Sequence, residues 1–362
     1  MNIGFDAKRA LNNSTGLGNY ARHLINGLLT HFPENDYVLY SPAVSEPFID
    51  NLKDGYRIRL PEKTWHRTFG SWWRSWGVSD AIAREHTTIF HGLSNELPIG
   101  INRARTKTVV TIHDLLFLDY PEHYSYLDRK IYETKTRYAA RQADKVIAVS
   151  EETKQDLTVR YKVPAEKIEV VYPIISIPSI PQTIQVPSPY ILNVGSLVER
   201  KNQKRLIEAY ALIEKYVQEE LWIVGTGPLK QELELLINQL KLRGRVKVIT
   251  GLHNQDLTAI YKNATAFIYP SLKEGFGMPI VEALLSEIPV VASAGGAIEE
   301  AAGPGSLFFD SQSSHEIAQQ ITRVLNDKTL RQEMIGSGII HAQKMKSKKL
   351  SEQLMAVYNS IL

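Results

Sequence analysis

The sequence, 362 residues long, contains no cysteine. This absence excludes disulfide bonds, thiolate metal ligands and cysteine nucleophiles, and it fits a reducing compartment. Long hydrophobic runs are also missing, because no apolar segment approaches the length that a membrane-spanning helix needs. The first residues lack the apolar stretch of a signal peptide. We therefore expect a cytoplasmic protein.

An excess of either charge is missing as well. Lys and Arg together number 42 and Asp and Glu 39, which leaves a net charge of +3. Binding to nucleic acid through its phosphates needs a basic arm or stripe, so no nucleic-acid partner is expected. Hydrophobic residues make up 43% of the chain, as in ordinary globular proteins, and the length predicts about two domains.

Proline is thinly spread except in one segment near the middle of the chain. Five of the 17 prolines lie between Pro173 and Pro189. Because proline fixes φ and removes a hydrogen-bond donor, this segment reads as an extended linker. We predict a first domain at residues 1–172, a linker at 173–188, a second domain at 189–345 and a final helical segment at 346–362.

Short β-branched runs alternate with longer amphipathic stretches on both sides of the linker. Strands separated by helices indicate parallel βαβ units, so we predict an α/β fold with two Rossmann-like, doubly wound domains. In such sheets, ligands bind beyond the carboxyl ends of the strands. The predicted strands span residues 2–6, 37–41, 87–91, 109–113, 145–150, 168–172, 190–196, 220–224, 245–250, 265–270, 288–293 and 306–309.

A glycine-containing segment, Gly16–Ala21, follows the first predicted strand. Its sequence, GLGNYA, is formally a dinucleotide fingerprint. The stretch that separates it from Asp6 is too long for the tight turn of that motif, and the second strand ends in Ser41-Pro42 rather than in a ribose-binding acid. A nicotinamide or flavin site is therefore disfavoured. A glycine loop at a helix N-terminus would still suit an anionic group, and the alternative is a flexible turn without a ligand.

Polar residues follow other predicted strands. His113 and Asp114 end the 109–113 strand, where a histidine is either ligand-facing or structural. In the second half, Arg200 and Lys201 come shortly after the strand-end residue Gly195. Arginine offers phosphate a bidentate fork and lysine a point charge, so this pair predicts a phosphate site unless it is simply solvated.

The most informative stretch is residues 274–284, EGFGMPIVEAL. Pro279 suits the first turn of a helix, and the preceding glycines allow an unusual loop, so backbone N–H groups would point out of the helix N-terminus. Glu274 in the loop and Glu282 in the helix would accept hydrogen bonds from sugar and ribose hydroxyls. They are less convincing as a glycosidase pair, which must flank one bond from opposite sides.

These motifs, together with residues 225–228 (GTGP) and 249–252 (ITGL), resemble the family 4 retaining glycosyltransferases (glycosyl transferases group 1), in order over nearly the whole chain. The resemblance implies the GT-B fold, in which two Rossmann-like domains face a cleft. The N-terminal domain would bind the acceptor and the C-terminal domain the nucleotide-diphosphate sugar. It also implies that the last helix packs back on the N-terminal domain.

The resemblance further implies roles for particular residues. Arg200 and Lys201 would hold the diphosphate, and His113 would face the transferred sugar. Gly18 would offer its N–H to the distal phosphate, and Leu252 would border the base. The expected catalytic residues are His113, Arg200, Lys201 and Glu274. The expected nucleotide-sugar-binding residues are Gly16, Gly18, Gly195, Leu252, Gly275, Phe276, Gly277, Met278 and Glu282.

We therefore expect a hexose, with mannose favoured, to be transferred with retention from a GDP- or UDP-linked sugar to a glycan or lipid-linked acceptor in surface polysaccharide biosynthesis. No metal or cofactor is implied, because two cations and a helix N-terminus take over the role of a metal. The alternatives are another enzyme of the same fold, such as a sugar-nucleotide epimerase or a phosphorylase, and a non-catalytic nucleotide-sugar-binding protein. The intact set of charged residues argues against the last.

Four of the five tryptophans lie within 12 residues and at helical spacing, with basic neighbours. We favour a helix that faces the core of the acceptor domain. The alternative is a basic aromatic helix that contacts a lipid surface or a lipid-linked acceptor, which would place the protein at the inner face of the membrane. The tryptophans are Trp65, Trp72, Trp73 and Trp76.

Overall fold

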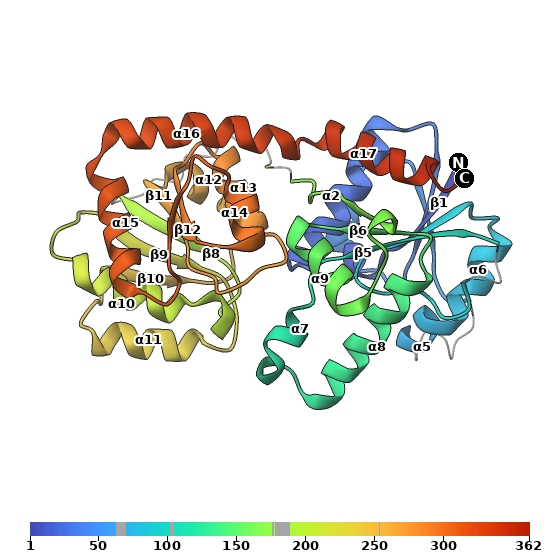
Figure 1. Cartoon of the computed structure of the whole chain (residues 1–362), viewed down its shortest axis with the longest axis horizontal. Coiled ribbons are helices and arrows are strands. Elements are labelled where there is room, and N and C mark those ends of the chain that lie inside the picture. The colour runs from blue at the N-terminus through green and yellow to red at the C-terminus, as the bar shows by residue number, and fades with distance from the viewer. Residues whose placement is uncertain (63–69, 102–104, 176, 178–188, 253) are drawn as a thin grey trace. The chain divides into compact units, whose positions relative to one another are not determined.

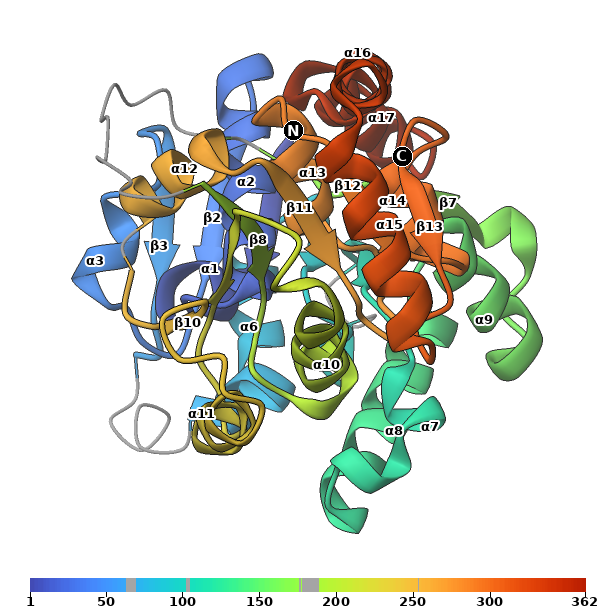
Figure 2. The same ribbon diagram turned by 90° about the vertical axis from the view of Figure 1, so that its left-hand side faces the viewer.

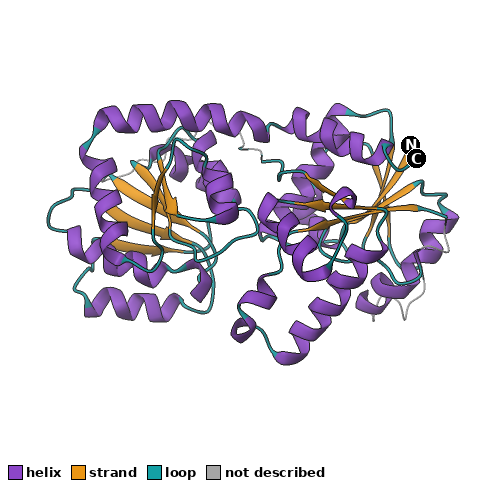
Figure 3. Cartoon of the chain, viewed as in Figure 1, coloured by secondary structure: helices purple, strands orange, loops and turns teal. Residues whose placement is uncertain are grey.

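The computed structural model describes residues 1–62, 70–101, 105–175, 177, 189–252 and 254–362. The chain forms two compact units. Unit 1 comprises Met1–Ile175 and Met345–Leu362, and unit 2 comprises Ser176–Lys344. Each unit has its own parallel sheet with helices around it (Figure 3). Most of the predicted proline-rich linker lies outside the described residues.

Unit 1 contains a seven-stranded sheet with the order β3-β2-β1-β4-β5-β6-β7, in which all neighbouring strands are parallel. The strand order reverses between β1 and β4, which is where ligands bind in such sheets. The strands are β1 (Asn2–Asp6), β2 (Asp36–Tyr40), β3 (Tyr56–Arg59), β4 (Ile89–Gly92), β5 (Lys107–Ile112), β6 (Lys145–Ala148) and β7 (Ile168–Val170).

Unit 2 contains a six-stranded parallel sheet with the order β10-β9-β8-β11-β12-β13, so the order reverses between β8 and β11. Two doubly wound α/β sheets are thus present, and the predicted fold class is confirmed. The strands are β8 (Tyr190–Val194), β9 (Glu220–Val224), β10 (Val246–Ile249), β11 (Ala266–Tyr269), β12 (Val290–Ser293) and β13 (Leu307–Phe309).

Helices lie between most successive strands, because parallel neighbours need a crossover connection. In unit 1 they are α1 (Lys8–Asn12), α2 (Gly16–His31), α3 (Glu46–Ile49), α5 (Gly70–Trp72), α6 (Val78–Arg84), α7 (Leu116–Asp119), α8 (Tyr126–Gln142), α9 (Glu151–Tyr161) and α17 (Ser347–Asn359). In unit 2 they are α10 (Gln203–Ile213), α11 (Lys230–Gln239), α12 (Asn254–Asn263), α13 (Met278–Leu285), α14 (Gly296–Ala302), α15 (Ser314–Asn326) and α16 (Lys328–Ala342). Single π or 3-10 turns occur at Trp73–Gly77, Pro121–His123, Ala165–Lys167, Glu199–Lys201 and Gln343–Met345.

The core of unit 2 lies between its sheet and the helices α10, α11 and α15. Tyr210 of α10 and Ile321 of α15 are completely buried in one cluster with Ile223 and Ile268 from the sheet. Figure 2 shows α10 and α15 side by side on this face. The apolar positions of these helices recur at intervals of three and four residues, which is why the amphipathic pattern identifies them in the sequence.

The last helix, α17, follows unit 2 in the chain but packs on α2 of unit 1 (Figure 1). Leu350 and Leu354 on its inner face are 1% exposed. The two helices approach closely at Gly27, where a Cβ would lie 2.6 Å from the Ser351 hydroxyl oxygen. A glycine at this position therefore permits the contact, and both ends of the chain belong to unit 1.

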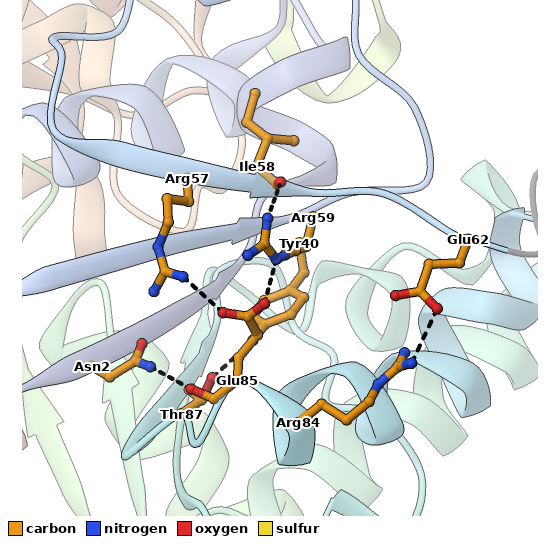
Figure 4. Close-up of polar contacts among 9 residues, drawn as sticks. All are labelled: Asn2, Tyr40, Arg57, Ile58, Arg59, Glu62, Arg84, Glu85 and Thr87. Carbon is orange, nitrogen blue, oxygen red and sulfur yellow. Dashed lines mark hydrogen bonds and ion pairs between the residues drawn. The ribbon is translucent and has the colours of Figure 1, made fainter.

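The edge strand β3 has no counterpart among the predicted strands. Its four residues include Arg57 and Arg59, which form ion pairs with Glu85 directly after α6 (Figure 4). The Arg57 Nη1 lies 2.9 Å from the Glu85 carboxylate. The hydrogen bond from Arg59 and the charges of both arginines hold the pKa of Glu85 below its ordinary value. Basic residues of this kind protect an edge strand from pairing with other chains.

Candidate functional site

Three charged residues meet at the carboxyl edge of the unit 2 sheet. Arg200 and Lys201 lie in the 3-10 turn that follows β8, and Glu274 lies in the loop between β11 and α13. Because β8 and β11 are neighbours in the sheet, their carboxyl ends bring these two loops together. This is the point at which the strand order reverses and where open α/β sheets bind ligands.

One carboxylate oxygen holds both cations. Glu274 Oε1 lies 2.6 Å from Arg200 Nη1 and 2.7 Å from Lys201 Nζ. Arg200 Nη1 also donates to the Lys273 carbonyl at 2.6 Å, and Lys201 Nζ donates to the Tyr269 hydroxyl at 2.6 Å. Lys201 and Glu274 are each only 9% exposed. The side chains form a rigid charged cluster with one more positive than negative charge.

Burial and charge act in opposite directions on these groups. Burial by itself raises the pKa of Glu274, but the charges of Lys201 and Arg200 and their hydrogen bonds outweigh it and lower the pKa to about 2. Burial lowers the pKa of Lys201, as does the nearby Arg200, while Glu274 raises it. The carboxylate is therefore ionised throughout the physiological range, and it is the group that allows two cations to lie side by side in a buried place.

The backbone around the cluster is fixed by side-chain contacts. Asn202, in the left-handed region with φ 57°, donates from its amide to the Pro270 and Ser311 carbonyls at 3.1 and 2.8 Å. The Leu272 N–H donates to the Arg200 carbonyl at 2.9 Å. Gly195 lies against the stem of Lys201, where a Cβ would lie 3.4 Å from Lys201 Cε. The loops after β8 and β11 are thus bound to each other.

The loop after Glu274 leads into the N-terminus of α13. Gly277 precedes the helix with φ 110°, a conformation that side chains rarely adopt, which explains a glycine there. Phe276 is buried at 4% exposure, whereas Gly275 and Met278 are partly exposed. The first N–H groups of a helix have no carbonyl partner within it. α13 begins at the same sheet edge as the cations, but Pro279 has no N–H and the Ile280 N–H already donates to the Gly277 carbonyl at 2.9 Å, so few of its first N–H groups can face a ligand.

Glu282 lies on α13 and is not part of the charged cluster. Its Oε2 accepts a hydrogen bond from the Tyr261 hydroxyl at 2.8 Å. Burial raises the pKa of Glu282, although the hydrogen bond from Tyr261 acts in the opposite direction. Leu252 follows β10, which β9 separates from β8, and it is partly buried. The structure therefore brings together Arg200, Lys201 and Glu274, but neither of these two residues joins them.

The glycine segment of unit 1 forms the first turn of a helix rather than a loop that precedes the helix. Helix α2 already begins at Gly16, after the N-cap residue Thr15. The N–H of Gly18 donates to the Thr15 carbonyl at 2.9 Å, and its role as a donor to a phosphate stays a prediction. The reason for a glycine is steric. A Cβ at Gly18 would lie 1.9 Å from the Asn13 carbonyl oxygen.

His113 follows β5 and is held on several sides. Its Nε2 lies 2.9 Å from the Leu93 carbonyl, which can only accept, so Nε2 carries the proton. Its backbone N–H donates to the Asn95 side chain at 2.8 Å, and the Tyr20 ring stands edge-on with a centroid distance of 4.6 Å. Burial lowers the pKa of His113 to about 4. The imidazole is therefore neutral at pH 7, and Nδ1 is its accepting nitrogen.

Behind His113 lies a buried hydrogen-bonded chain that the sequence does not reveal. The Tyr20 hydroxyl lies 3.0 Å from the Thr111 hydroxyl, which lies 2.9 Å from His91 Nε2. His91 Nδ1 lies 2.7 Å from the hydroxyl of Tyr358 on α17. Burial lowers the pKa of His91 to about 3, so this ring is neutral too. The only sign of this hydrogen-bonded chain in the sequence was the position of His91 at the end of a predicted strand.

The tryptophan segment is partly core and partly surface. Trp73 is 3% exposed and belongs to the core cluster of unit 1, as the favoured interpretation predicts. Trp72 and Trp76 are 45% and 52% exposed. Trp65 lies outside the described residues. Within the described ranges, no helix combines the length and apolarity that crossing a bilayer requires.

A gathering of three or more potential metal-binding His, Asp or Glu side chains is absent from the described part of the chain. The donors at the β8 and β11 sheet edge are instead a guanidinium, an ammonium and backbone N–H groups. Such a set suits a ligand with phosphate groups and hydroxyls.

Comparisons with known proteins cover both units. The family described as Glycosyltransferase Family 4 matches residues 14–177, and Glycosyl transferases group 1 matches residues 179–340. O-antigen chain mannosyltransferase B of Escherichia coli is 26% identical over 322 residues, which cover 85% of this chain and 80% of that protein.

Solved structures show the same fold. Anabaena HepE, in complex with UDP and glucose, superposes with a TM-score of 0.76 at 20% identity, over 99% of this chain and 100% of that chain. WaaG, a glycosyltransferase involved in lipopolysaccharide biosynthesis, gives a TM-score of 0.73 at 16% identity, over 98% of this chain and 99% of that chain.

Proposed function

The chain belongs to the family 4 glycosyltransferases (glycosyl transferases group 1) and has the GT-B fold, and from this premise we propose which group it transfers. We propose that it moves a hexose, mannose, from a nucleotide-diphosphate sugar to a glycan or lipid-linked acceptor in surface polysaccharide biosynthesis. The relative named O-antigen chain mannosyltransferase B supports both the sugar and the pathway class.

One observation carries the proposal for the donor. Arg200 and Lys201 converge on Glu274 at the sheet edge where the strand order reverses, beside the N-terminus of α13. Two cations held at this edge suit a diphosphate. They would also stabilise the negative charge that the leaving nucleoside diphosphate develops in the transition state. The structure of HepE in complex with UDP and glucose supports a donor of this class.

We propose that the transfer proceeds with retention at the anomeric carbon and on one face of the sugar. In such a reaction the bond from the anomeric carbon to the phosphate oxygen breaks, the acceptor oxygen bonds to that carbon, and the acceptor proton passes to the phosphate oxygen. The protein would contribute mainly positioning and charge stabilisation. Neutral His113 would accept a hydrogen bond from a sugar hydroxyl at Nδ1. The Glu282 carboxylate would accept a hydrogen bond from a ribose hydroxyl.

The experiment that tests the proposal is a thermal-shift screen with UDP, GDP, ADP and their sugars, followed by donor turnover. A ligand present at a hundred times its Kd stabilises the folded chain by about 2.7 kcal/mol. GDP and GDP-mannose are expected to raise the Tm, and incubation with GDP-mannose to release GDP slowly. If only UDP-sugars raised the Tm, GDP-mannose would not be the donor and the proposed transfer of mannose from it would be wrong. Conversion of the free donor to its epimer, with no nucleoside diphosphate released, would identify an epimerase.

We further propose that the exposed Trp72 and Trp76 contact a membrane that carries a lipid-linked acceptor. Both side chains present large aromatic surfaces to solvent, and tryptophan favours the lipid interface. The Trp72→Ser, Trp76→Ser double variant is expected to sediment less with vesicles of anionic phospholipid than the unchanged chain. Leu212→Ser with Tyr216→Ser, which removes exposed apolar side chains from unit 2, is the control. Equal sedimentation of all three proteins would refute the contact.

A further inference from the structure

Tyr269, the last residue of β11, has no role in the proposed function, yet it contacts Lys201 in two ways. Its hydroxyl accepts a hydrogen bond from Lys201 Nζ at 2.6 Å, and its ring centre lies 4.9 Å from the same nitrogen. The side chain is 1% exposed. A buried hydroxyl without a partner costs free energy, and here the hydroxyl lies in the charged cluster, where it accepts from Lys201 and also interacts with Glu274.

The contact has a geometric consequence for Lys201. An ammonium group has three N–H bonds in a tetrahedral arrangement and rotates freely about its stem. Glu274 Oε1 receives one of these bonds and the Tyr269 hydroxyl a second. With two acceptors fixed, rotation stops and the third N–H has a single direction. With the Glu274 acceptor alone, the ammonium would still turn about that one hydrogen bond.

The position of the Tyr269 ring is itself fixed. Phe267, on the same face of β11, lies against it with a centroid distance of 5.8 Å and a near-parallel ring. Phe267 also contacts the Tyr261 ring with a centroid distance of 5.6 Å, and the Tyr261 hydroxyl donates to Glu282. Burial raises the pKa of Tyr269, and Glu274 raises it further, so the hydroxyl stays neutral and accepts from Lys201. The neutral hydroxyl adds no charge to the cluster.

We propose that Tyr269 is a positioning residue whose hydroxyl, together with Glu274, directs the third N–H of Lys201 at the diphosphate of the donor. The inference rests on the proposed function, because it assumes that Lys201 binds the diphosphate. The step that it adds is that the ammonium is held at a fixed orientation before the ligand arrives. Preorganised donors of this kind cost little reorganisation free energy during the reaction, since they already point at the position where negative charge develops.

The test replaces Tyr269→Phe, which keeps the ring and removes the hydroxyl oxygen. Tyr190→Phe is the matched control. Tyr190 is also fully buried in unit 2 and donates to the Ile260 carbonyl at 2.5 Å, but it begins β8 and so lies at the opposite edge of the sheet. Both variants lose one buried hydroxyl. A loss of stability that both share therefore reflects the missing hydroxyl in general and not the contact with Lys201.

Calorimetry measures the Kd of GDP and of UDP, and the Kd of guanosine and of uridine for comparison. Tyr269→Phe is expected to weaken binding of the nucleoside diphosphate about tenfold and to leave nucleoside binding unchanged, because the Lys201 ammonium loses its fixed direction and its charge-assisted hydrogen bond to the diphosphate is weakened. The kcat is expected to fall by more than KM rises. Tyr190→Phe is expected to bind both ligands as the unchanged chain does. Equal diphosphate affinity in both variants would overturn the proposal.

A second readout does not depend on any ligand. The ammonium nitrogen of Lys201 is observed by NMR in protein with labelled lysine, and the signal is assigned by its loss in Lys201→Met. Tyr269→Phe is expected to move this signal and to let it exchange faster with water, whereas Tyr190→Phe leaves it in place. An unchanged signal would refute the positioning role. If the signal changes but neither diphosphate binds even the unchanged chain, the proposed function fails and the positioning contact stands.

Discussion

Replacing Lys201→Met is expected to lower kcat/KM for sugar transfer by about 10² to 10³, because removal of one preorganised donor to a developing anion has an effect of this size. Methionine replaces the apolar stem of lysine up to Cε and lacks only the terminal ammonium group. The Glu274 carboxylate keeps its ion pair with Arg200 at 2.6 Å, so the variant is expected to remain folded. Steady-state kinetics with the donor identified by the thermal-shift screen check the prediction.

The control for this variant is Lys204→Met. Lys204 lies on α10 near Lys201, but it pairs with Glu199 and Glu232 at 2.8 and 2.6 Å and takes no part in the cluster. It is expected to keep its activity within about twofold, since surface ion pairs contribute little. The double variant Arg200→Ala, Lys201→Ala goes one step further. If its turnover matched that of the unchanged chain, the assignment of the phosphate site would be wrong.

Replacing Glu274→Gln is expected to lower the free energy of unfolding by about 3 kcal/mol at pH 7. Two cations would then lie side by side in a buried place without a counter-charge, and breaking a buried pair typically costs 3–5 kcal/mol. The pKa leads to a similar value. Glu274 has a pKa of about 2 in the fold against an ordinary value of 4.5, and this difference corresponds to about 3 kcal/mol.

The pH dependence of this effect follows from the direction of the shift. Because the pKa of Glu274 is lower in the folded than in the unfolded chain, its contribution is present above about pH 4.5 and is lost as the pH falls towards 2. The unchanged chain and Glu274→Gln are therefore expected to differ most near neutral pH and to converge in acid. Urea unfolding between pH 3 and 7 measures this difference.

Glu220→Gln is the control for the stability experiment. Glu220 is as buried as Glu274, and it pairs with Lys247 at 2.6 Å. The Lys247 side chain is 39% exposed, so water can solvate its charge when the partner is removed. A smaller loss of stability is expected for Glu220→Gln than for Glu274→Gln. Equal losses that do not vary with pH would show that packing, and not the charge on Glu274, is responsible.

The sequence predicts most strands because buried parallel strands consist of β-branched and apolar runs that differ clearly from amphipathic helices. Strand β3 escapes this criterion, since Tyr56–Arg59 alternates with arginines and is stabilised by Glu85 from another part of the chain. The glycine segment misleads for a related reason. Local sequence suggests a glycine loop at Gly16–Gly18, but the close Asn13 carbonyl makes Gly18 a packing requirement inside α2.

The candidate site was predictable as a set of residues but not as a geometry. Arg200, Lys201 and Glu274 stand out because charged residues after buried strands gather at one sheet edge. Their shared oxygen could not be foreseen, because it depends on β8 and β11 being neighbours. The neutral state of His113 was equally hidden, since it results from burial, which outweighs the opposite effect of the hydrogen bond to the Leu93 carbonyl on the pKa.

What the sequence determined by itself is the α/β class, the absence of cysteine chemistry and the types of charged residue at the strand ends, because each of these depends on local composition and periodicity. Only the tertiary structure decided which distant residues meet. The order of strands in a sheet is a non-local property, and it placed Tyr269 beside Lys201. It also decided that Gly18 donates within a helix and that Tyr358 of the last helix reaches His91.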